Sequence, residues 1–285
     1  MAVGSKKSKI WPHVFMLAGL AVVFFPVWMA FVASTHTLKE VIQYPSPVLP
    51  GTAFFDNYWT ALTEGYGSFT GGGTAGMGRQ LFNSLIMALG ISIGKISISI
   101  IAAYAIVFFR FPMRMFAFWM IFMTLMLPVE VRILPTYKVV ADLGMLNSYP
   151  GLILPLIASA TATFLFRQIF LTIPDEMVES AKVDGVSAMR FFWDFVLPLS
   201  RNNIAALFVI LFIYGWNQYL WPLIITTDPQ MSTAVMGIGR VLNVGDDQAP
   251  WHLVMTSAML AMIPPILVVI FMQKQFVRGL VEQEK

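Results

Sequence analysis

Long apolar stretches separated by short polar segments dominate the pattern along the chain. Each stretch is close to the ~20 helical residues that cross a hydrocarbon core of ~30 Å, and helices satisfy their own backbone hydrogen bonds there. The pattern lacks the residue-by-residue alternation of an outer-membrane barrel strand. We therefore predict an all-α integral membrane protein with six transmembrane helices. The predicted spans lie near residues 13–34, 81–109, 115–140, 150–171, 203–226 and 251–274.

The segments between the predicted spans define the organisation of the chain. Residues 1–12 form a short N-terminal tail, and residues 13–285 form one transmembrane domain. The lysines ahead of the first apolar run resemble the start of a signal peptide. That run is too long for one, and no small-residue cleavage site follows it, so we interpret 13–34 as a retained helix. The longest loop facing the same side as the tail is 172–202.

Composition excludes several classes of protein. The chain is 58% hydrophobic and only 12% charged, whereas soluble domains are about 25% charged. It contains no cysteine, which excludes disulfides and cysteine-based zinc sites. The formal net charge of +3 gives no support for nucleic-acid binding. His13, His36 and His252 are scattered, so no metal site or catalytic triad is predicted.

The distribution of Lys and Arg sets the predicted orientation. If the N-terminus is cytoplasmic, twelve of the eighteen Lys and Arg residues face the cytoplasm and four face outward. The remaining two, Lys95 and Arg132, fall within predicted spans. Cytoplasmic loops carry an excess of these cations in membrane proteins. Both termini are therefore expected in the cytoplasm.

The loop from Thr172 to Leu199 reads TIPDEMVESAKVDGVSAMRFFWDFVLPL. Thr172 is predicted to cap a first helix with acids in its first turn, and Gly185 to end it in the left-handed conformation. Ser187 is predicted to cap a second helix that Pro198 interrupts before the fifth span. Such an exposed pair of helices is either an amphipathic element on the membrane surface or a docking element for a soluble partner. The spacing of residues in the loop does not distinguish these two interpretations.

The same loop resembles the signature of the permease subunits of ATP-binding cassette (ABC) importers. That signature is E-A-A, three residues, G, nine residues, then I-x-L-P. Here Ser180 stands at the second position and Phe195 at the Ile position, and the rest of the register is kept. The match on the predicted cytoplasmic side favours the docking interpretation. The residues that the resemblance assigns to ATPase coupling are Glu179, Ser180, Ala181, Asp184, Gly185 and Pro198.

Further segments resemble the carbohydrate-uptake group of the same family. They are MLPVEVRILPTY from Met126, LGMLNSY from Leu143 and GWNQYLWPL from Gly215. The run from Arg110 to Asp228 is most similar to the smaller permeases of glycerol-3-phosphate importers. With the six spans, the resemblance covers nearly the whole chain.

The resemblance implies a bacterial inner-membrane complex with a defined set of partners. These are a homologous second permease, two ABC ATPase subunits, an extracytoplasmic solute-binding protein and the lipid membrane. ATP and Mg²⁺ would bind the separate ATPase subunits, so this chain would carry no cofactor and no catalytic residue. Gly90, Gly94 and Lys95 only loosely resemble a phosphate loop, because the spacing differs and Ile96 replaces the Ser or Thr. Glu179 would pair with a basic group of the ATPase, and Gly185 would allow a sharp turn.

Three charged residues lie within predicted spans: Lys95, Glu130 and Arg132. A charge at bilayer depth is costly and usually faces protein or a water-filled cavity. Pro128 and Pro135 bracket two of them, and broken helices of this kind occur at transporter sites. We hypothesise that Arg132 offers positive charge to a phosphate group, with Glu130 beside it on the pathway. Alternatively, Arg132 pairs with Glu130 or lies near the outer membrane interface.

Polar and aromatic residues also gather within the fifth predicted span. They are candidates for the lining of a translocation pathway. Side chains of this kind also form hydrogen bonds between helices or an aromatic belt at the membrane interface, and the solute can contact mainly the partner permease. The residues are Trp216, Asn217, Gln218 and Tyr219.

Other functions remain open at this point. The same class of importer can carry a sugar, an oligosaccharide or a polyol instead of a glycerol phosphate or glycerophosphodiester. A stand-alone secondary transporter would bring its own ion-coupling groups and usually more spans. A membrane-embedded enzyme would need acids or histidines concentrated at one membrane face, whereas the cytoplasmic acids here fall mostly in the 172–202 loop.

Overall fold

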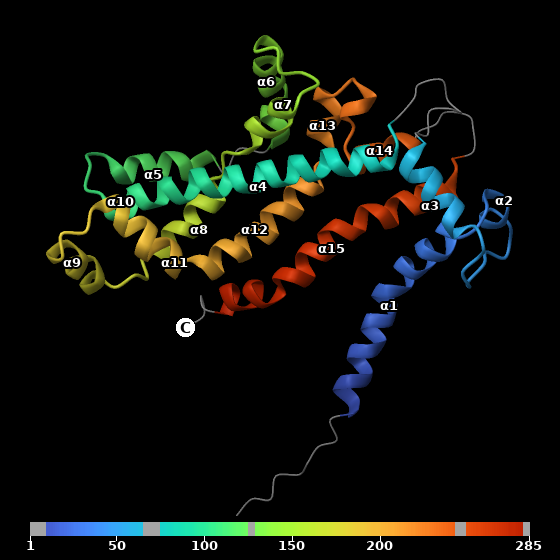
Figure 1. The fold of residues 1–285 in the computed structure, drawn as a ribbon, viewed down its shortest axis with the longest axis horizontal. Coiled ribbons are helices and arrows are strands. Elements are labelled where there is room, and N and C mark those ends of the chain that lie inside the picture. The colour runs from blue at the N-terminus through green and yellow to red at the C-terminus, as the bar shows by residue number, and fades with distance from the viewer. Residues whose placement is uncertain (1–9, 65–74, 125–128, 243–248, 282–285) are drawn as a thin grey trace, which may run out of the picture. The chain divides into compact units, whose positions relative to one another are not determined.

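The fold is all-helical, as the apolar pattern predicts (Figure 1). The computed structural model describes residues 10–64, 75–124, 129–242 and 249–281, and every regular element within them is a helix. The side chains of Ile10, Val129, Glu130 and 276–281 lie outside this description. The chain divides into two compact units. One comprises residues up to Met77 together with Ile238–Leu260, and the other Gly78–Gly237 together with residues from Ala261 onward.

The first unit is organised around the end of its N-terminal helix. Three helices begin it, and parts of two later helices complete it. The three are α1 (Ile10–Ser34), α2 (Leu38–Val41) and α3 (Phe54–Thr63). The later contributions are the last residues of α14 (Ala234–Leu242) and the first ten of α15 (Trp251–Val281).

Asn57 of α3 holds the C-terminal end of α1 in place. Its amide donates hydrogen bonds to the carbonyl oxygens of Ser34 and His36, each over 2.8 Å. Thr256 of α15 also donates to the Ser34 oxygen, over 3.3 Å. The last carbonyls of a helix have no partner within the helix, so a buried end needs acceptors satisfied from outside. The buried Asn57 amide provides this.

A short turn follows α1 and is closed by a carboxylate. The backbone N–H and the hydroxyl of Thr37 both donate to the carboxylate of Glu40, each over 2.9 Å. These hydrogen bonds, with a smaller contribution from His36, hold the pKa of the Glu40 carboxyl below its usual value. Thr37 is the N-cap of α2 and Glu40 its third residue, and their pairing is a capping box.

The second unit is built along one long helix, α4 (Met77–Phe108), which is traced through the unit in Figure 1. Helices far apart in sequence pack along its two halves. They are α5 (Arg114–Met123), α6 (Val129–Asp142), α7 (Tyr149–Ile153), η3 (Leu154–Leu156), α8 (Ala160–Phe170), α9 (Asp175–Val183), α10 (Ala188–Phe191), the π-helical turn η4 (Phe192–Val196), α11 (Leu197–Leu199), α12 (Arg201–Trp216), α13 (Leu220–Ile225) and η5 (Pro229–Met231).

Small residues on α4 allow neighbouring helices to approach its backbone. A Cβ atom on Gly90 would lie 2.6 Å from the side chain of Ile153, and one on Gly94 would lie 2.6 Å from that of Ile157. Small residues spaced by four form such contact faces in membrane helices. The two glycines that loosely resemble a phosphate loop are therefore accounted for by helix packing.

Three helices of the described chain are long and apolar enough to cross a membrane, namely Trp11–Ser34, Met77–Phe108 and Trp251–Gln275. Two bent pairs raise the number to five if each pair is one span. One pair is Tyr149–Leu156 with Ala160–Phe170, bent by 51°, and the other is Ala188–Leu199 with Arg201–Trp216, bent by 72°. The count of six spans remains a prediction.

Three of the predicted spans are not single helices. The range 150–171 is the first of them, because it contains the bent pair of Tyr149–Leu156 and Ala160–Phe170. The range 115–140 contains α5 and α6, with residues 125–128 between them outside the described part of the chain. The range 203–226 is interrupted after Trp216, where Asn217 caps α12 and α13 begins three residues later. Pro135 does not break α6, and the hydroxyl of Thr136 donates to the Arg132 carbonyl one turn back.

Replacing Asn57 with Ala should lower the free energy of unfolding by about 1–3 kcal/mol, because buried carbonyl oxygens lose their donor. Thermal unfolding of the purified protein in detergent would measure this. Gln43→Ala, which removes an exposed amide, is the matched control and should leave the transition in place. Equal stability of the two variants would contradict the assigned role of Asn57.

Candidate functional site

Helix α9 begins and ends through local interactions within the 172–202 loop. Asp175 and Glu176 occupy its first turn, where negative charge is favoured. Its C-terminus is a Schellman motif, in which Gly185 N–H donates to the Lys182 oxygen over 3.1 Å and Val186 N–H to the Ala181 oxygen over 2.9 Å. Gly185 has φ +69°, as predicted for the residue that ends this helix.

The predicted cap at Thr172 is wrong. Its hydroxyl donates to the Ile169 oxygen over 2.7 Å and so belongs to the end of α8. Pro174 occupies the cap position of α9 instead, in an extended conformation and without a side-chain hydrogen bond. A Thr hydroxyl can donate to a carbonyl of the preceding turn or accept from an N–H of the following helix. Thr172 makes the first of these hydrogen bonds.

The second helix of the loop begins as predicted and ends differently. Ser187 caps α10 by accepting a hydrogen bond from the Arg190 N–H over 3.3 Å. Pro198 does not stop the helix, because the chain passes through the π-helical turn η4 and continues into α11. Proline lacks an N–H and clashes with the carbonyl four residues earlier, so a widened turn before it is expected. The 72° bend into α12 falls at Ser200.

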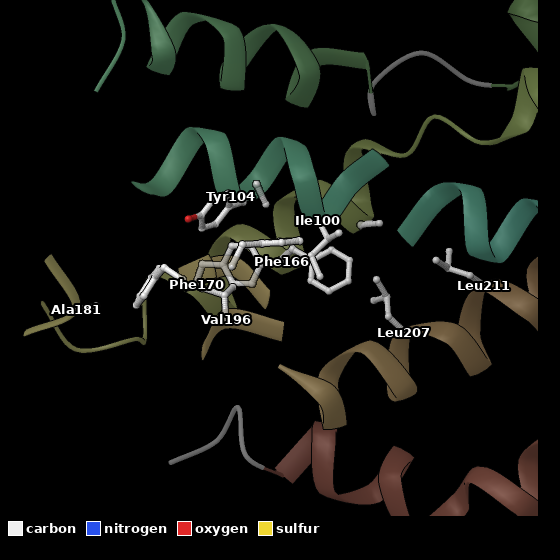
Figure 2. Packing of buried hydrophobic residues seen from close by; sticks show 12 residues of the cluster. Ile100, Tyr104, Phe166, Phe170, Ala181, Val196, Leu207 and Leu211 are labelled. Atoms are coloured by element: carbon white, nitrogen blue, oxygen red, sulfur yellow. The ribbon is translucent and has the colours of Figure 1, made fainter. Parts of the chain in front are cut away.

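A buried apolar cluster joins the loop to the helices of the unit (Figure 2). Ala181 of α9, Phe191 of α10 and Val196 of η4 belong to it. In Figure 2 the Phe166 ring lies near Ile100 and Val196, with Ala181 apart at the left and Leu207 toward the right, and all of them are members of the cluster. Close packing of this kind is stiff, so a displacement of the loop moves the helices with it. Its other members are Ala103, Tyr104, Ala162, Phe170, Phe192 and Leu211.

Tyr104 adds a polar connection that the sequence did not reveal. Its hydroxyl donates to the Ala188 oxygen over 2.6 Å, which ties α4 to the first residue of α10. Its ring also contacts Phe108, Phe109 and Phe192. The only signal in the sequence is an aromatic residue near the end of a span, and that is typical of an interface belt.

The loop exposes the residues that the signature assigns to a partner. On α9 and at its end, the exposed residues are Glu179, Ser180 and Asp184. Pro198 of α11 is also exposed, whereas Ala181 of α9 is buried in the cluster. Large apolar side chains are exposed beside them: Val183 is 87%, Met189 67% and Trp193 62% exposed. Arg190 and Asp194 form an exposed ion pair at 3.1 Å. The surface is thus mixed, with acidic and apolar groups on a stiff support.

The candidate pathway residues at the end of α12 do not share one environment. Trp216 is buried, and its indole N–H donates to the Ala261 oxygen of α15 over 3.1 Å. Gln218 donates to the Tyr214 oxygen over 3.0 Å, while Asn217 and Tyr219 are exposed. Trp216 therefore joins α12 to α15, and Asn217 and Tyr219 are the candidates whose polar groups are exposed.

The charged residues within spans also differ in environment. Arg132 is half-buried on α6. Lys95 on α4 is buried, with its ammonium nitrogen 3.8 Å from the centroid of the Tyr214 ring. Glu130 belongs to α6, but its side chain lies outside the described residues. Among the described residues no group of three or more His, Cys, Asp or Glu could hold a metal ion.

The chain matches the model of a protein family described as the binding-protein-dependent transport system inner membrane component. The match covers residues 95–282, which is well over half of the chain. It includes the whole 172–202 loop, the cluster below it and both Lys95 and Arg132.

Curated relatives match over nearly their full length. The sn-glycerol-3-phosphate transport system permease protein UgpE of Brucella melitensis is 56% identical over 278 residues, which is 98% of each chain. The proteins of the same name from Rhizobium meliloti and Pectobacterium atrosepticum are 54% and 55% identical, over 98% and 97% of each chain.

Solved structures share the fold. A chain of a bacterial ABC transporter involved in the import of the acidic polysaccharide alginate superposes with a TM-score of 0.80 at 19% identity, over 97% of this chain and 100% of that chain. A chain of the alginate transporter in complex with its alginate pentasaccharide-bound periplasmic protein gives 0.60 at 14% identity, over 92% of each chain. The chain therefore belongs to the family of inner membrane components of binding-protein-dependent transport systems.

Proposed function

We propose that this chain is the membrane-spanning permease subunit of an ATP-driven importer of sn-glycerol-3-phosphate or related glycerophosphodiesters. The observation that carries the proposal is the identity of 53–56%, over nearly the full length, with relatives named for sn-glycerol-3-phosphate transport. The family description supplies the dependence on an external binding protein. A neutral sugar as the solute has no comparable support.

The proposed complex lies in the bacterial inner membrane. Six spans place both termini in the cytoplasm, on the same side as the 172–202 loop, in keeping with the bias of Lys and Arg. The partners are a homologous second permease, two ABC ATPase subunits and a solute-binding protein outside the membrane. ATP and Mg²⁺ bind the ATPase subunits, and this chain does no bond chemistry.

The exposed face of α9 is the proposed contact with an ATPase subunit. Glu179 and Val183 lie there on the side opposite the buried Ala181, which supports an outward-facing docking surface. Exposed apolar residues next to charged ones are typical of protein interfaces. Glu179 pairs with a basic group of the ATPase, and the left-handed Gly185 lets the chain turn back at the end of the docking helix.

The stiff support beneath this surface is the proposed transmission. ATP binding draws the ATPase subunits together and carries the docked loops with them. The cluster around Phe166 and the Tyr104–Ala188 hydrogen bond then move α4, α8 and α12 as packed bodies. Alternation between inward-open and outward-open states follows if each state makes different contacts, and hydrolysis resets the cycle.

The proposed pathway for the solute passes Arg132 and the exposed end of α12. Arg132 supplies a guanidinium whose fork matches phosphate oxygens. Asn217 and Tyr219 offer polar groups at the α12–α13 break, where their exposure is compatible with a water-filled route. Glu130 belongs to the same α6 segment as Arg132.

Proteoliposomes holding the reconstituted complex and its binding protein should accumulate labelled sn-glycerol-3-phosphate only when ATP is hydrolysed. A non-hydrolysable ATP analogue and labelled maltose are the controls, and neither should give uptake. Uptake without ATP would contradict the importer mechanism. Uptake of maltose alone would retain the mechanism and refute the solute.

Reversal of charge at Glu179 should weaken assembly with the ATPase. Glu179→Lys places like charge against the proposed basic partner, so the association constant should fall by more than about tenfold. Co-purification of tagged ATPase with the permease pair would measure this. Asp142→Lys makes the same change at an exposed site at the end of α6 and should have no effect. Equal recovery of ATPase with both variants would refute the docking role.

We expect the effect of substitutions at Gly185 to come from its left-handed backbone conformation and not from steric crowding of the new side chain. A Cβ there meets nothing within 4 Å, so only the positive φ opposes a side chain. Gly185→Ala should cost about 1–2 kcal/mol in the folded turn and lower ATPase activity stimulated by the loaded binding protein. Gly185→Asn tolerates the left-handed region and should retain most of that activity. The opposite order of the two variants would contradict this account.

A further inference from the structure

Lys95 is a buried cation near the middle of the long membrane helix α4. Its exposure is 7%, and the ammonium nitrogen lies 3.8 Å from the centroid of the Tyr214 ring on α12. An ionisable side chain at such depth is costly and generally marks a partner or a pathway. A ring face attracts a cation, but more weakly than a carboxylate or phosphate in the same place.

The described surroundings of Lys95 contain no opposite charge. Among the side chains that the structure describes, the ion pair recorded is that of Arg190 with Asp194, which is exposed on the 172–202 loop. Arg132, which has the same sign, lies on α6 beside Ile133, and Ile133 packs against the same apolar cluster as Tyr214. Two cations thus lie on helices that pack against one cluster inside the second unit, and the ring of Tyr214 is in contact with one of them, Lys95.

Packing explains how α4, α6 and α12 bring these groups together. Ile91 lies one turn before Lys95 and is a buried member of one apolar cluster. Ile133, next to Arg132, and Tyr214 both pack against that same cluster. The three helices that carry the two cations and the ring are therefore fixed against one another by shared side chains.

The two buried serines about one turn before and one turn after Lys95 on α4 do not neutralise it. The hydroxyl of Ser92 donates to the Ala88 oxygen over 2.6 Å, and that of Ser99 to the Ser159 oxygen over 3.2 Å. Both hydroxyls are engaged with backbone carbonyls and carry no charge. A ligand that completes this arrangement is an anion, and two cations suit a phosphate monoester with its two negative charges.

We propose that Lys95 and Arg132 form a phosphate-binding pair on the translocation pathway, with Tyr214 holding Lys95 ready between solute molecules. The inference rests on the proposed function and assigns the solute's phosphate group to these residues. Lysine suits the task as a compact charge on a flexible stem that can leave the ring for a phosphate oxygen. The weak ring contact takes the ammonium back when the solute leaves, so the site binds reversibly.

The pair also gives the pathway a basis for selectivity. A neutral sugar would leave both cations without a counter-charge and would displace water from them. Rejection by unpaired charge is a recognised route to specificity. Discrimination in favour of phosphate thus resides in the permease as well as in the binding protein.

The test uses the whole complex in proteoliposomes, with uptake of labelled sn-glycerol-3-phosphate and ATP hydrolysis measured on the same vesicles. Lys95→Met keeps an unbranched side chain only one atom shorter and removes the charge. It should lower uptake by more than about tenfold while hydrolysis continues, so that the ATP consumed per solute rises. Lys95→Arg should recover part of the uptake. Lys138→Met, the same change at an exposed site on α6, should behave as wild type.

Tyr214 provides an independent pair of variants. Tyr214→Phe keeps the ring face and should retain most of the uptake, whereas Tyr214→Leu removes it and should lower uptake. If Lys95→Met fails to assemble with its partners, this pair carries the test. Equal behaviour of the two Tyr214 variants would refute the role of the ring.

The outcomes separate the inference from the proposed function. Wild-type vesicles that import no glycerol phosphate with ATP would refute the proposed function. If the wild type imports glycerol phosphate and Lys95→Met imports it equally well, the inference alone is refuted. A parallel fall in uptake and ATP hydrolysis in Lys95→Met would also refute it, because that result indicates a structural role. Repetition in vesicles of zwitterionic lipid and of lipid with an anionic fraction distinguishes the source of the phosphate. A loss confined to the anionic vesicles would assign Lys95 to lipid headgroups and overturn the solute assignment.

Discussion

The coupling of the exposed loop to the membrane helices depends on one buried group of aromatic and aliphatic side chains. Phe166 and Phe170 of α8 meet Phe191 of α10 and Val196 of η4, and α4 closes the group from another side. The group joins side chains of membrane helices to side chains of the loop, and close packing among them makes the two parts move together. A loosely packed loop could bind a partner but could not move the helices.

The parts of this loop that were predictable are those set by neighbours in sequence. The cap at Ser187 and the left-handed Gly185 depend on groups within a few residues, and both were found where the pattern indicated them. The prediction at Thr172 failed because its hydroxyl has equivalent choices on two sides. The π-helical turn before Pro198 was also missed, since proline's missing N–H permits several outcomes and packing of Phe192 and Val196 selects one.

The surroundings of the membrane charges could not be predicted, for a different reason. The sequence shows that Lys95 and Arg132 fall within spans, but their environment is made by helices distant along the chain. Tyr214 lies just before the segment singled out for its polar and aromatic residues and was not itself a candidate, and Trp216 within that segment proved to join α12 to α15. The sequence showed that Gly94, beside Lys95, is not part of a true phosphate loop, but only the close approach of Ile157 explains why a small residue stands there. The roles of the exposed coupling residues depend on partners and remain predictions.

In the proposed mechanism, the bend at Ser200 sets the direction in which a moving loop would push on α12. The segments Ala188–Leu199 and Arg201–Trp216 meet at 72°, whose cosine is about 0.3. A displacement along the first segment therefore acts on α12 mainly sideways, and less than a third of it lies along the axis of that helix. A helix that slides along its axis must break the interdigitated contacts of all its side chains together. A helix that tilts about one end changes the contacts near that end only slightly. Because of the bend at Ser200, a displacement along Ala188–Leu199 would therefore tilt α12 more than it would slide it along its axis.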